Sequence, residues 1–332
     1  MAKVAINGLG RIGRAALKIV LDTPELELTA LNDIVPANNL AYLLNFDTVY
    51  RRYEKKVESG PDSLVIDGKT YPLFSEKDPA KLPWGKLGVD IVLECTGVFT
   101  KLEDLKKHVQ AGAKYVLLSA PAKGEGVSTV VHGVNKPDGS ANIFSCASCT
   151  TNCISPVVEI MGRRIGIKKA IMTTVHAYTA SQAIVDGPNK KMRRGRAGAA
   201  NLVPTSTGAA IATTKAMPEY QGKFDGVAVR APVPVGSIAD LVFVTERKTS
   251  VDEINQIFRE ESQSMRYKGI LGASDEGLVS SDIIKDPRAS IVDLEMTQVV
   301  DGDLVKVMSW YDNEWGYTNQ LIREAVRVSK EI

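Results

Sequence analysis

Residues 3–14, KVAINGLGRIGR, decide the fold of the N-terminal half of the chain. The run KVAI is apolar and typical of a buried strand, and the glycines after it have the spacing G-x-G-x-x-G (Gly8, Gly10, Gly13). Residues 12–22 then repeat apolar side chains at helical spacing, and residues 26–31 form a second strand-like run. Strand, glycine turn, helix and strand in this order predict a βαβ unit of a parallel sheet.

Asp33 follows Gly13 by twenty residues, at the end of the second predicted strand. A carboxylate there can accept hydrogen bonds from both hydroxyls of an adenosine ribose, while the helix N-terminus holds a pyrophosphate. The same charge repels a 2′-phosphate, so the sequence favours NAD and leaves NADP as an alternative. A tight turn whose glycines serve packing alone is the competing interpretation.

The length of 332 residues corresponds to about two domains. Strand patterns at 90–94, 115–118 and 143–144 and a helical pattern at 103–111 extend the first unit, which predicts a doubly wound parallel (Rossmann) domain over 1–148. Longer strand patterns follow a helix at 150–164, and they predict a mixed α+β catalytic domain over 149–312. The C-terminal segment, about 313–332, contains an amphipathic helix that we expect to pack back on the first domain.

The small net charge disfavours partners that bind mainly through electrostatic attraction. Lys plus Arg number 41 and Asp plus Glu 39, a net charge of +2, so nucleic acid is not expected as a main partner and a membrane is not expected at all. No leader is expected at the N-terminus, where no apolar run with a cleavage site can be drawn, and four cysteines are too few for a disulfide framework. A reducing, cytoplasmic location is the expectation.

Cys149 is the candidate nucleophile because it falls at the first turn of the helix predicted over 150–164. Free backbone amides and the helix dipole stabilise a thiolate there. Cys146, Cys149 and Cys153 also have a C-x-x-C-x-x-x-C spacing, which leaves a metal site as an alternative. No fourth ligand lies within reach by spacing, so no metal is predicted, and Cys153 and Cys95 are expected to be buried small residues.

His176 is the candidate base, since it ends an apolar strand pattern and His has a suitable pKa for proton transfer. A core histidine is the alternative, and His108 and His132 are expected to be structural or surface groups. The hydroxyls of residues 205–207 and the guanidinium of Arg230 are suited to holding a phosphate. The basic run at 190–196 is typical of a solvated loop or a phosphate site, with nucleic-acid binding as the alternative.

Several motifs together resemble phosphorylating glyceraldehyde-3-phosphate dehydrogenases over essentially the whole chain. The most specific are INGLGRIGR, ECTG, LSAPAK, ASCTTNC, TVHAYT, RRGRAGAANLVPTSTGAA and WYDNEWGY. The resemblance implies that Cys149 forms a thiohemiacetal with D-glyceraldehyde 3-phosphate, that NAD oxidises it to a thioester, and that inorganic phosphate releases 1,3-bisphosphoglycerate. His176 would raise the thiolate population and act as base in the oxidation.

The resemblance also implies the residues that bind each ligand. Cofactor contacts are expected from Arg11, Ile12, Asp33, Lys77, Thr96, Ser119 and Asn313, in addition to Gly8 and Gly10 of the glycine turn. Thr179 and Arg230 would hold the substrate phosphate, and the attacking phosphate would lie among Ser148, Thr150, Arg194, Thr207 and Gly208. The long loop at 178–202 is similar to one that lines a neighbouring subunit's cofactor site, which implies a homotetramer.

Two positions depart from the family pattern. Cys146 stands where Asn is usual, which adds a possible resolving thiol near Cys149, and Ile211 replaces a Lys near the phosphate region. Pro188 agrees with the NAD-using members. Erythrose-4-phosphate dehydrogenase is the alternative within the class, disfavoured because Tyr178, Thr179 and Ser206-Thr207-Gly208 are kept; an RNA-binding or redox-sensing role is the alternative from outside it.

Overall fold

The computed structural model describes residues 1–137, 139 and 141–332. These residues fold into two compact units. The first comprises Met1–Val130, Lys136–Ala147 and Leu321–Ile332, and the second comprises Val131–Asn135 and Ser148–Gln320. The boundary near the C-terminus therefore falls within the last helix, α8 (Trp315–Ser329). The domains predicted from sequence, 1–148 with the segment 313–332 and 149–312, stay a prediction.

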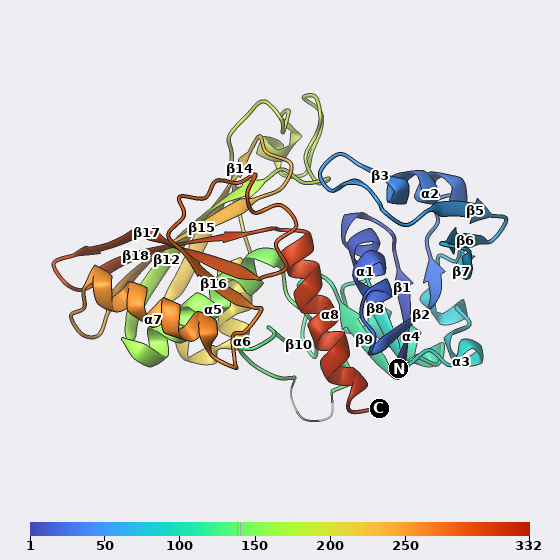
Figure 1. Cartoon of the computed structure of the whole chain (residues 1–332), viewed down its shortest axis with the longest axis horizontal. Helices are drawn as coiled ribbons and strands as arrows, with labels where there is room; N and C mark the ends of the chain where they lie inside the picture. The colour runs from blue at the N-terminus through green and yellow to red at the C-terminus, as the bar shows by residue number, and fades with distance from the viewer. Residues whose placement is uncertain (138, 140) are drawn as a thin grey trace. The chain divides into compact units, whose positions relative to one another are not determined.

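The described part of the first unit is built on a nine-stranded sheet, drawn in blue to green in Figure 1. Its order is β10 (Ser128–Thr129), β11 (Ile143–Ser145), β9 (Tyr115–Leu118), β8 (Ile91–Glu94), β1 (Ala2–Asn7), β2 (Leu26–Asn32), β7 (Lys69–Phe74), β6 (Ser63–Ile66) and β5 (Val57–Gly60). Pairing is parallel from β10 to β7, and β7, β6 and β5 form an antiparallel edge. The parallel α/β fold expected from the glycine turn is confirmed.

Crossover helices follow the strands as the apolar periodicity predicts. Helix α1 (Arg11–Leu21) connects β1 to β2, and α4 (Leu102–Gln110) connects β8 to β9. The other elements of this unit are α2 (Ala37–Asn45), the pair β3 (Phe46–Asp47) and β4 (Arg51–Arg52), η1 (Pro79–Lys81) and α3 (Trp84–Leu87).

Three neighbouring strands of this sheet end in polar residues at the same level. Asn7 of β1 pairs in register with Asn32 of β2 and with Glu94 of β8. Because the strands are parallel, the turns after them lie along one edge of the sheet, where ligands bind in open α/β folds.

The second unit has a seven-stranded mixed sheet among its described residues. The order is β13 (Val203–Ser206), β14 (Phe224–Ala231), β12 (Ile167–Ala177), β15 (Ser237–Thr245), β18 (Leu304–Tyr311), β17 (Ser290–Val300) and β16 (Leu271–Ser274). Helices α5 (Cys149–Arg164), α6 (Ala209–Ala216) and α7 (Val251–Gln263) cover one face (Figure 1), and the short helices η2 (Met192–Gly195) and η3 (Pro218–Tyr220) lie in loops. The predicted mixed α+β domain is confirmed.

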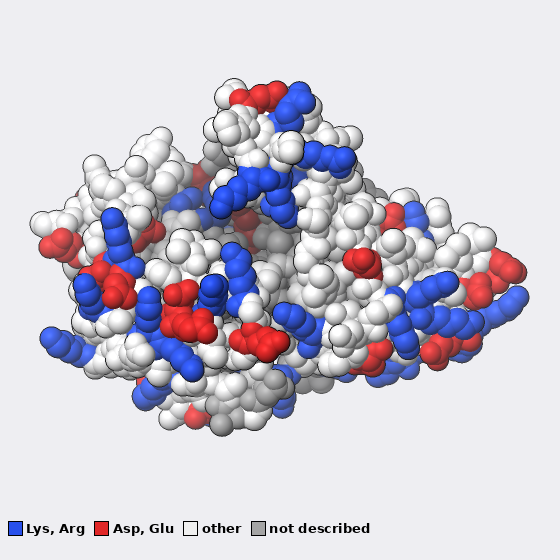
Figure 2. Space-filling view, turned by 180° about the vertical axis from the view of Figure 1, so that it is seen from behind, with Lys and Arg blue, Asp and Glu red and all other residues white. Residues whose placement is uncertain are grey.

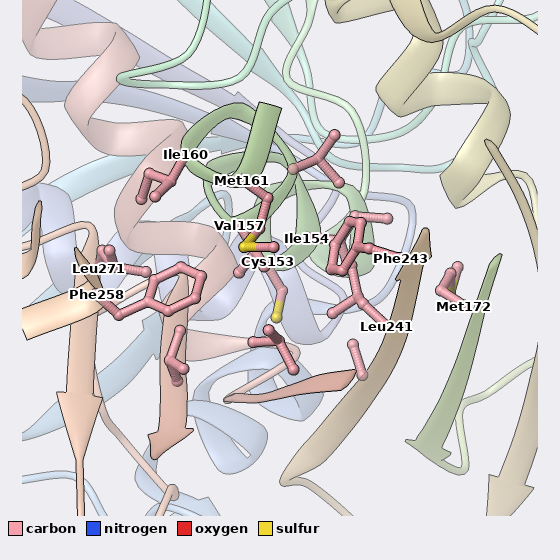
Figure 3. Close-up of a cluster of buried hydrophobic side chains, with 14 of the residues drawn as sticks. Cys153, Ile154, Val157, Ile160, Met161, Met172, Leu241, Phe243, Phe258 and Leu271 are labelled. Atoms are coloured by element: carbon pink, nitrogen blue, oxygen red, sulfur yellow. The ribbon is translucent and has the colours of Figure 1, made fainter. Parts of the chain in front are cut away.

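The core of the second unit lies between α5 and the sheet. Figure 3 shows Ile154, Val157 and Met161 of α5 gathered with Leu241 and Phe243 of β15 and Phe258 of α7, and all of them are buried. Helix α5 continues through Pro156, so this proline does not stop the helix. A well-packed α5 fixes the residues at its N-terminus in position.

The surface carries both signs of charge. On the face shown in Figure 2, Lys and Arg side chains are interspersed with Asp and Glu, in agreement with a net charge of only +2. Within the described part of the chain, no helix is long and apolar enough to cross a membrane.

Candidate active site

The first turn of α5 is organised by Ser148. This residue precedes the helix with extended backbone, and its hydroxyl accepts a hydrogen bond from the Thr151 amide at 3.2 Å. The cap satisfies one free amide and begins the helix at Cys149. Cys149 therefore lies at the positive end of the helix dipole, as the sequence predicts.

Cys149 and His176 lie side by side, although 27 residues separate them in the chain. The Sγ atom of Cys149 is 3.4 Å from Nε2 of His176, which is near the end of β12. Nδ1 of His176 is 2.7 Å from the carbonyl oxygen of Ala177. When Nδ1 carries the proton and donates to this carbonyl, the lone pair of Nε2 faces the sulfur and can accept its proton.

The surroundings favour the neutral forms of this pair. Burial raises the pKa of the Cys149 thiol, and the nearby Arg230 charge and a hydrogen bond with Thr150 act in the opposite direction. Burial and the Arg230 charge together lower the pKa of His176 to about 3. Burial thus outweighs the effect of the N-terminal amides of α5, and a neutral thiol and a neutral imidazole face each other in the resting site.

Arg230 brings an anion-binding group to the same place. Its Nη1 donates to the Ala177 carbonyl at 3.0 Å and lies against Nδ1 of His176. Its Nε is buried and has no acceptor among the described residues. A buried guanidinium donor without a partner fits a phosphate or carboxylate ligand, whose oxygens would accept this bond.

Tyr311 connects the two elements that carry the pair. Its hydroxyl is 2.8 Å from Oγ1 of Thr150, on α5, and 2.8 Å from Oγ1 of Thr174, on β12. The side chain is 1% exposed. Sequence reasoning placed Tyr311 within a motif without giving it a role, because bonds between residues 161 and 137 positions apart leave no periodic signal.

Ser237 links the end of β12 to Asn313. Its hydroxyl accepts from the Ala177 amide at 3.1 Å and donates to Oδ1 of Asn313 at 3.0 Å. With the oxygen engaged, the amide nitrogen of Asn313 is the group left to bind a ligand. Sequence reasoning missed Ser237 because a single buried serine in a strand has no distinctive pattern.

The remaining residues predicted to bind phosphate lie in the second unit as well. Arg194 donates from Nε to Oγ1 of Thr205 at 3.0 Å and is close enough to His176 to help lower the pKa of that ring. The Thr207 hydroxyl accepts from the Ala209 amide at 3.2 Å, and Gly208 precedes α6. Thr179 pairs with Ser181 through their hydroxyls at 2.8 Å.

A cavity of about 410 Å³ lies in the first unit at the carboxyl edge of its sheet. It brings together five of the residues predicted to bind the cofactor, and its lining includes Gly8, Gly10, Asp33, Lys77 and Thr96. Arg11, Ile12 and Ser119 are not in this lining. Arg11 instead forms an ion pair with Asp47 and lies over the ring of Tyr50.

The glycines of the first turn fit a dinucleotide for steric reasons. Gly8 has a φ of +92°, and a Cβ there would lie 2.7 Å from the Thr96 amide nitrogen. A Cβ at Gly13 would lie 1.8 Å from the Gly8 carbonyl oxygen, whereas Gly10 opens onto free space. The turn is thus closed tightly against the sheet while its outer side stays open for a phosphate.

Asp33 holds the same turn from the other side. Its Oδ2 accepts from the Leu9 amide at 2.5 Å and its Oδ1 from the Val35 amide at 2.9 Å. A carboxylate has about four acceptor sites, so lone pairs are left for the hydroxyls of a ribose. These residues fit the adenosine half of a dinucleotide.

The other cysteines differ from Cys149. Cys153 is fully buried in the apolar core shown in Figure 3, where its sulfur is 3.7 Å from the carbonyl oxygen of Ser309. Cys146 is buried in the first unit, and burial raises its pKa well above that of a free thiol. No group of three metal-ligating side chains is found within the described ranges. Ile211, the other departure, is 59% exposed on α6.

The two histidines outside the site, predicted to be structural or surface groups, differ in burial. His108 is fully buried on α4 and so is a structural group, whereas His132 is half-buried. The partners of His108, Glu94 and Trp84, are 14 and 24 residues away in the chain, so the pattern KKHVQAG does not show them.

Two family models match the chain. Residues 2–102 match "Glyceraldehyde 3-phosphate dehydrogenase, NAD binding domain", and residues 148–313 match "Glyceraldehyde 3-phosphate dehydrogenase, C-terminal domain". The chain is also similar to curated proteins named glyceraldehyde-3-phosphate dehydrogenase. It is 46% identical to one from Streptomyces coelicolor over 99% of both chains, 46% identical to one from Bacillus subtilis over 99% of this chain and 98% of the relative, and 48% identical to one from Mycobacterium bovis over 99% of both. Since the matches extend over nearly the full length of the chain and of these relatives, the protein belongs to the glyceraldehyde-3-phosphate dehydrogenase family.

Proposed function

We propose that the chain catalyses the phosphorylating oxidation of D-glyceraldehyde 3-phosphate to 1,3-bisphosphoglycerate, with NAD as oxidant, and that Cys149 and His176 carry the chemistry. The single observation that supports this most is the 3.4 Å approach of Cys149 Sγ to His176 Nε2, beside the Nε of Arg230, which has no acceptor in the part of the chain that the structure describes. A nucleophile, a base and an anion-binding group are the parts that the reaction needs.

In the first step His176 accepts the thiol proton at Nε2 while the Cys149 sulfur bonds to the aldehyde carbon. The carbonyl oxygen then takes a proton from the imidazolium, which gives a neutral thiohemiacetal and a neutral ring. The low pKa of His176, about 3, makes the imidazolium a strong acid for this return of the proton. Arg230 would hold the substrate phosphate through its free Nε and so orient the aldehyde.

In the second step neutral His176 removes the hydroxyl proton of the thiohemiacetal as its carbon is oxidised to a thioester. Bound NAD supplies the acceptor for the two electrons and the hydrogen that leave this carbon. Asn313, whose amide direction is fixed by Ser237, would hold the carboxamide of NAD.

In the third step an oxygen of inorganic phosphate attacks the thioester carbon, and the carbon–sulfur bond breaks. Cys149 leaves with the bonding electrons as a thiolate and takes back the proton that His176 removed in the second step, and 1,3-bisphosphoglycerate departs. We place the attacking phosphate among Ser148, Thr150, Arg194, Thr207 and Gly208, where hydroxyl groups, a guanidinium and the backbone before α6 supply donors.

The cofactor is NAD rather than NADP in this proposal. Asp33 places a carboxylate in the lining of the cavity, where it would repel a 2′-phosphate. Pro188 resembles the NAD-using members of the family.

A homotetramer is also proposed. The sheet face of the second unit that faces away from α5 carries exposed apolar side chains, among them Ile171 (60%), Val175 and Val227. The loop at 178–202, drawn in yellow-green near the top of Figure 1, adds Ile184, which is 88% exposed. Exposed apolar groups of this kind are typical of subunit interfaces. We propose a cytoplasmic location, in which the four cysteines stay reduced.

The test is the initial rate of nicotinamide reduction, followed by absorbance, with glyceraldehyde 3-phosphate. It is run with NAD or NADP and with or without phosphate, and then with erythrose 4-phosphate as substrate. We expect phosphate-dependent reduction with NAD preferred. Preference for NADP would contradict the cofactor assignment alone, and faster reduction with erythrose 4-phosphate would contradict the substrate.

A further inference from the structure

Glu94 is a fully buried carboxylate at the end of β8 that accepts four hydrogen bonds. Its Oε2 accepts from Nδ2 of Asn7 at 2.5 Å and faces Nε2 of His108 at 3.0 Å. Its Oε1 accepts from the amide of Thr96 at 2.8 Å and from the Thr96 hydroxyl. Both oxygens are thus engaged, and the side chain is 0% exposed. An unpaired carboxylate at such a position would be strongly destabilising, so these donors are needed for folding.

Trp84 determines the protonation of His108. The indole Nε1 of Trp84 is 3.0 Å from Nδ1 of His108, and an indole N–H can only donate. Nδ1 of His108 must therefore accept, and the ring carries its proton on Nε2, where it donates to Glu94. Trp84 and His108 are both 0% exposed. A buried chain of hydrogen bonds thus runs from Trp84 through His108 to the carboxylate of Glu94.

On its other side the carboxylate holds groups that line the cofactor cavity. Asn7 and Thr96 are in the lining, and so are Asn32 and Glu76. Oδ1 of Asn7 accepts from Nδ2 of Asn32 at 2.7 Å, and Asn32 exchanges two hydrogen bonds of 2.9 Å with the backbone of Glu76. Glu94, His108 and Trp84 lie outside this lining.

Thr96, which Glu94 holds through two hydrogen bonds, packs directly against the glycine turn. The Thr96 backbone and methyl group lie 2.7–2.8 Å from the position that a Cβ on Gly8 would take, so the two segments touch with no spare room. A shift of Thr96 therefore moves the wall of the cavity and the support of the turn together.

We propose that Glu94 is a positioning residue for the dinucleotide, and that the Trp84–His108 pair holds it in the direction that fixes Thr96 and Asn7. The inference rests on the proposed NAD-dependent function. Glu94 touches no ligand in this role. It determines where the groups in the cavity wall present their donors, as outer partners do around metal and catalytic sites.

The substitution Glu94→Gln tests this with almost no change in volume. A glutamine has one oxygen and one NH₂ group, so in either orientation the NH₂ faces a donor: Thr96 on one side, or Asn7 and His108 on the other. We expect calorimetry to show NAD binding weakened about tenfold or more, with the KM for glyceraldehyde 3-phosphate unchanged. The rate of Cys149 alkylation by iodoacetamide, a readout from the second unit that needs no cofactor, is expected to stay the same.

The pair His108→Leu and His108→Gln tests the outer part of the chain. Leu removes the donor to Glu94, whereas Gln retains an N–H at the position of Nε2. We expect weaker NAD binding in His108→Leu and recovery of most of it in His108→Gln, although residue 108 does not line the cavity. Val92→Ala is the matched control, because Val92 is a fully buried residue of the same strand, so its loss lowers stability and is expected to leave NAD affinity unchanged.

The outcomes separate the inference from the function on which it rests. Failure of the unaltered protein to bind NAD would contradict the proposed function. If the unaltered protein binds NAD and Glu94→Gln binds it equally well, or if Val92→Ala weakens binding as much at the same loss of melting temperature, Glu94 has only a structural role. If Glu94→Gln does not fold, the two His108 variants decide, and equal NAD affinity in both overturns the proposal. Selective ¹⁵N labelling of histidine gives a check without ligand, since protonation of His108 on Nδ1 would also overturn it.

Discussion

The ring of Tyr311 packs edge-on against the imidazole of His176, with 5.9 Å between the ring centroids and 76° between the planes. The hydroxyl of the same tyrosine lies between Thr150 of α5 and Thr174 of β12. One side chain therefore restrains both the helix that carries the nucleophile and the strand that carries the base. The distance between Cys149 and His176 depends on these two elements staying together.

Replacing Tyr311 by Phe is expected to loosen this arrangement while the ring keeps its contact with His176. The buried hydroxyls of Thr150 and Thr174 each lose the hydrogen bond to Tyr311, while Thr174 keeps its bond to the Ile238 carbonyl at 3.2 Å. We expect the loss to destabilise the fold by about 1–3 kcal/mol. We expect kcat to fall several-fold while the KM for NAD stays unchanged, since residue 311 is not in the lining of the cofactor cavity. Steady-state kinetics and thermal unfolding measure both effects.

Tyr267→Phe is the control for that variant. Tyr267 is also fully buried in the second unit, and its hydroxyl donates to Glu159 at 2.6 Å, away from the catalytic pair. Comparable loss of stability with unchanged kcat is expected. Equal losses of kcat in the two variants would show that Tyr311 acts only through overall stability.

Cys149 is proposed as the nucleophile and Cys153, four residues later, as a buried core residue, so substitutions at the two positions should have different effects. Cys149→Ser is expected to reduce turnover by roughly a thousandfold or more, because a serine hydroxyl next to a neutral histidine is a far weaker nucleophile toward the aldehyde. NAD binding should persist. Cys153→Ser places a hydroxyl beside Ser290 and Ser309 and should keep kcat within a few-fold, with a lower melting temperature. Loss of activity in Cys153→Ser at full folding, with activity retained in Cys149→Ser, would reverse the assignment.

The fold was predictable from sequence where the pattern is local. The strand, glycine turn, helix and strand over residues 3–31 match β1, α1 and β2 to within one or two residues, because a βαβ unit is specified by side chains close in sequence. The antiparallel edge β5–β7 and helices α6 and α7 were not identified. The edge strands are short, and the apolar periodicity of the two helices is interrupted by polar residues. Contacts with elements distant in sequence stabilise these segments, and a local pattern does not show such contacts.

The candidate site was predictable where chemistry is visible in single residues. Cys149 and His176 were singled out by residue type and by their place at the ends of elements, and the structure brings them within 3.4 Å. Tyr311, Ser237 and Glu94 were not assigned roles. Each acts through hydrogen bonds between residues far apart in the chain, so only the folded arrangement shows what each one holds in place.

The depressed pKa of His176 predicts a dependence of stability on pH. A histidine binds a proton near pH 6.5 in the unfolded chain but only near pH 3 in this site, where burial is the largest cause. Below pH 6.5 the unfolded chain binds a proton at residue 176 that the folded chain does not bind. The free energy of unfolding is therefore highest above pH 6.5 and falls as the pH falls toward 3. The slope approaches about 1.4 kcal/mol per pH unit within this window.

The measurement is the melting temperature of the unaltered protein and of His176→Asn at pH 7.0 and 5.5. The range stays above the values where most carboxylates titrate, so the difference between the two proteins isolates His176. We expect the unaltered protein to lose more stability than His176→Asn between these pH values. Identical losses would mean that residue 176 is not held neutral by its surroundings.

Asp33 predicts the choice between NAD and NADP. Asp33→Asn keeps the size of the side chain and removes the charge that would repel a 2′-phosphate, so the ratio of kcat/KM for NAD to that for NADP is expected to fall about tenfold. The amide oxygen can still accept from the Leu9 amide and so hold the glycine turn, whereas the NH₂ group then faces the Val35 amide and the hydrogen bond to Val35 is lost. Asp78→Asn is the control, because Asp78 lies one residue beyond Lys77 and outside the lining of the cavity. An unchanged ratio in Asp33→Asn, or an equal fall in Asp78→Asn, would show that discrimination between the two cofactors comes from elsewhere.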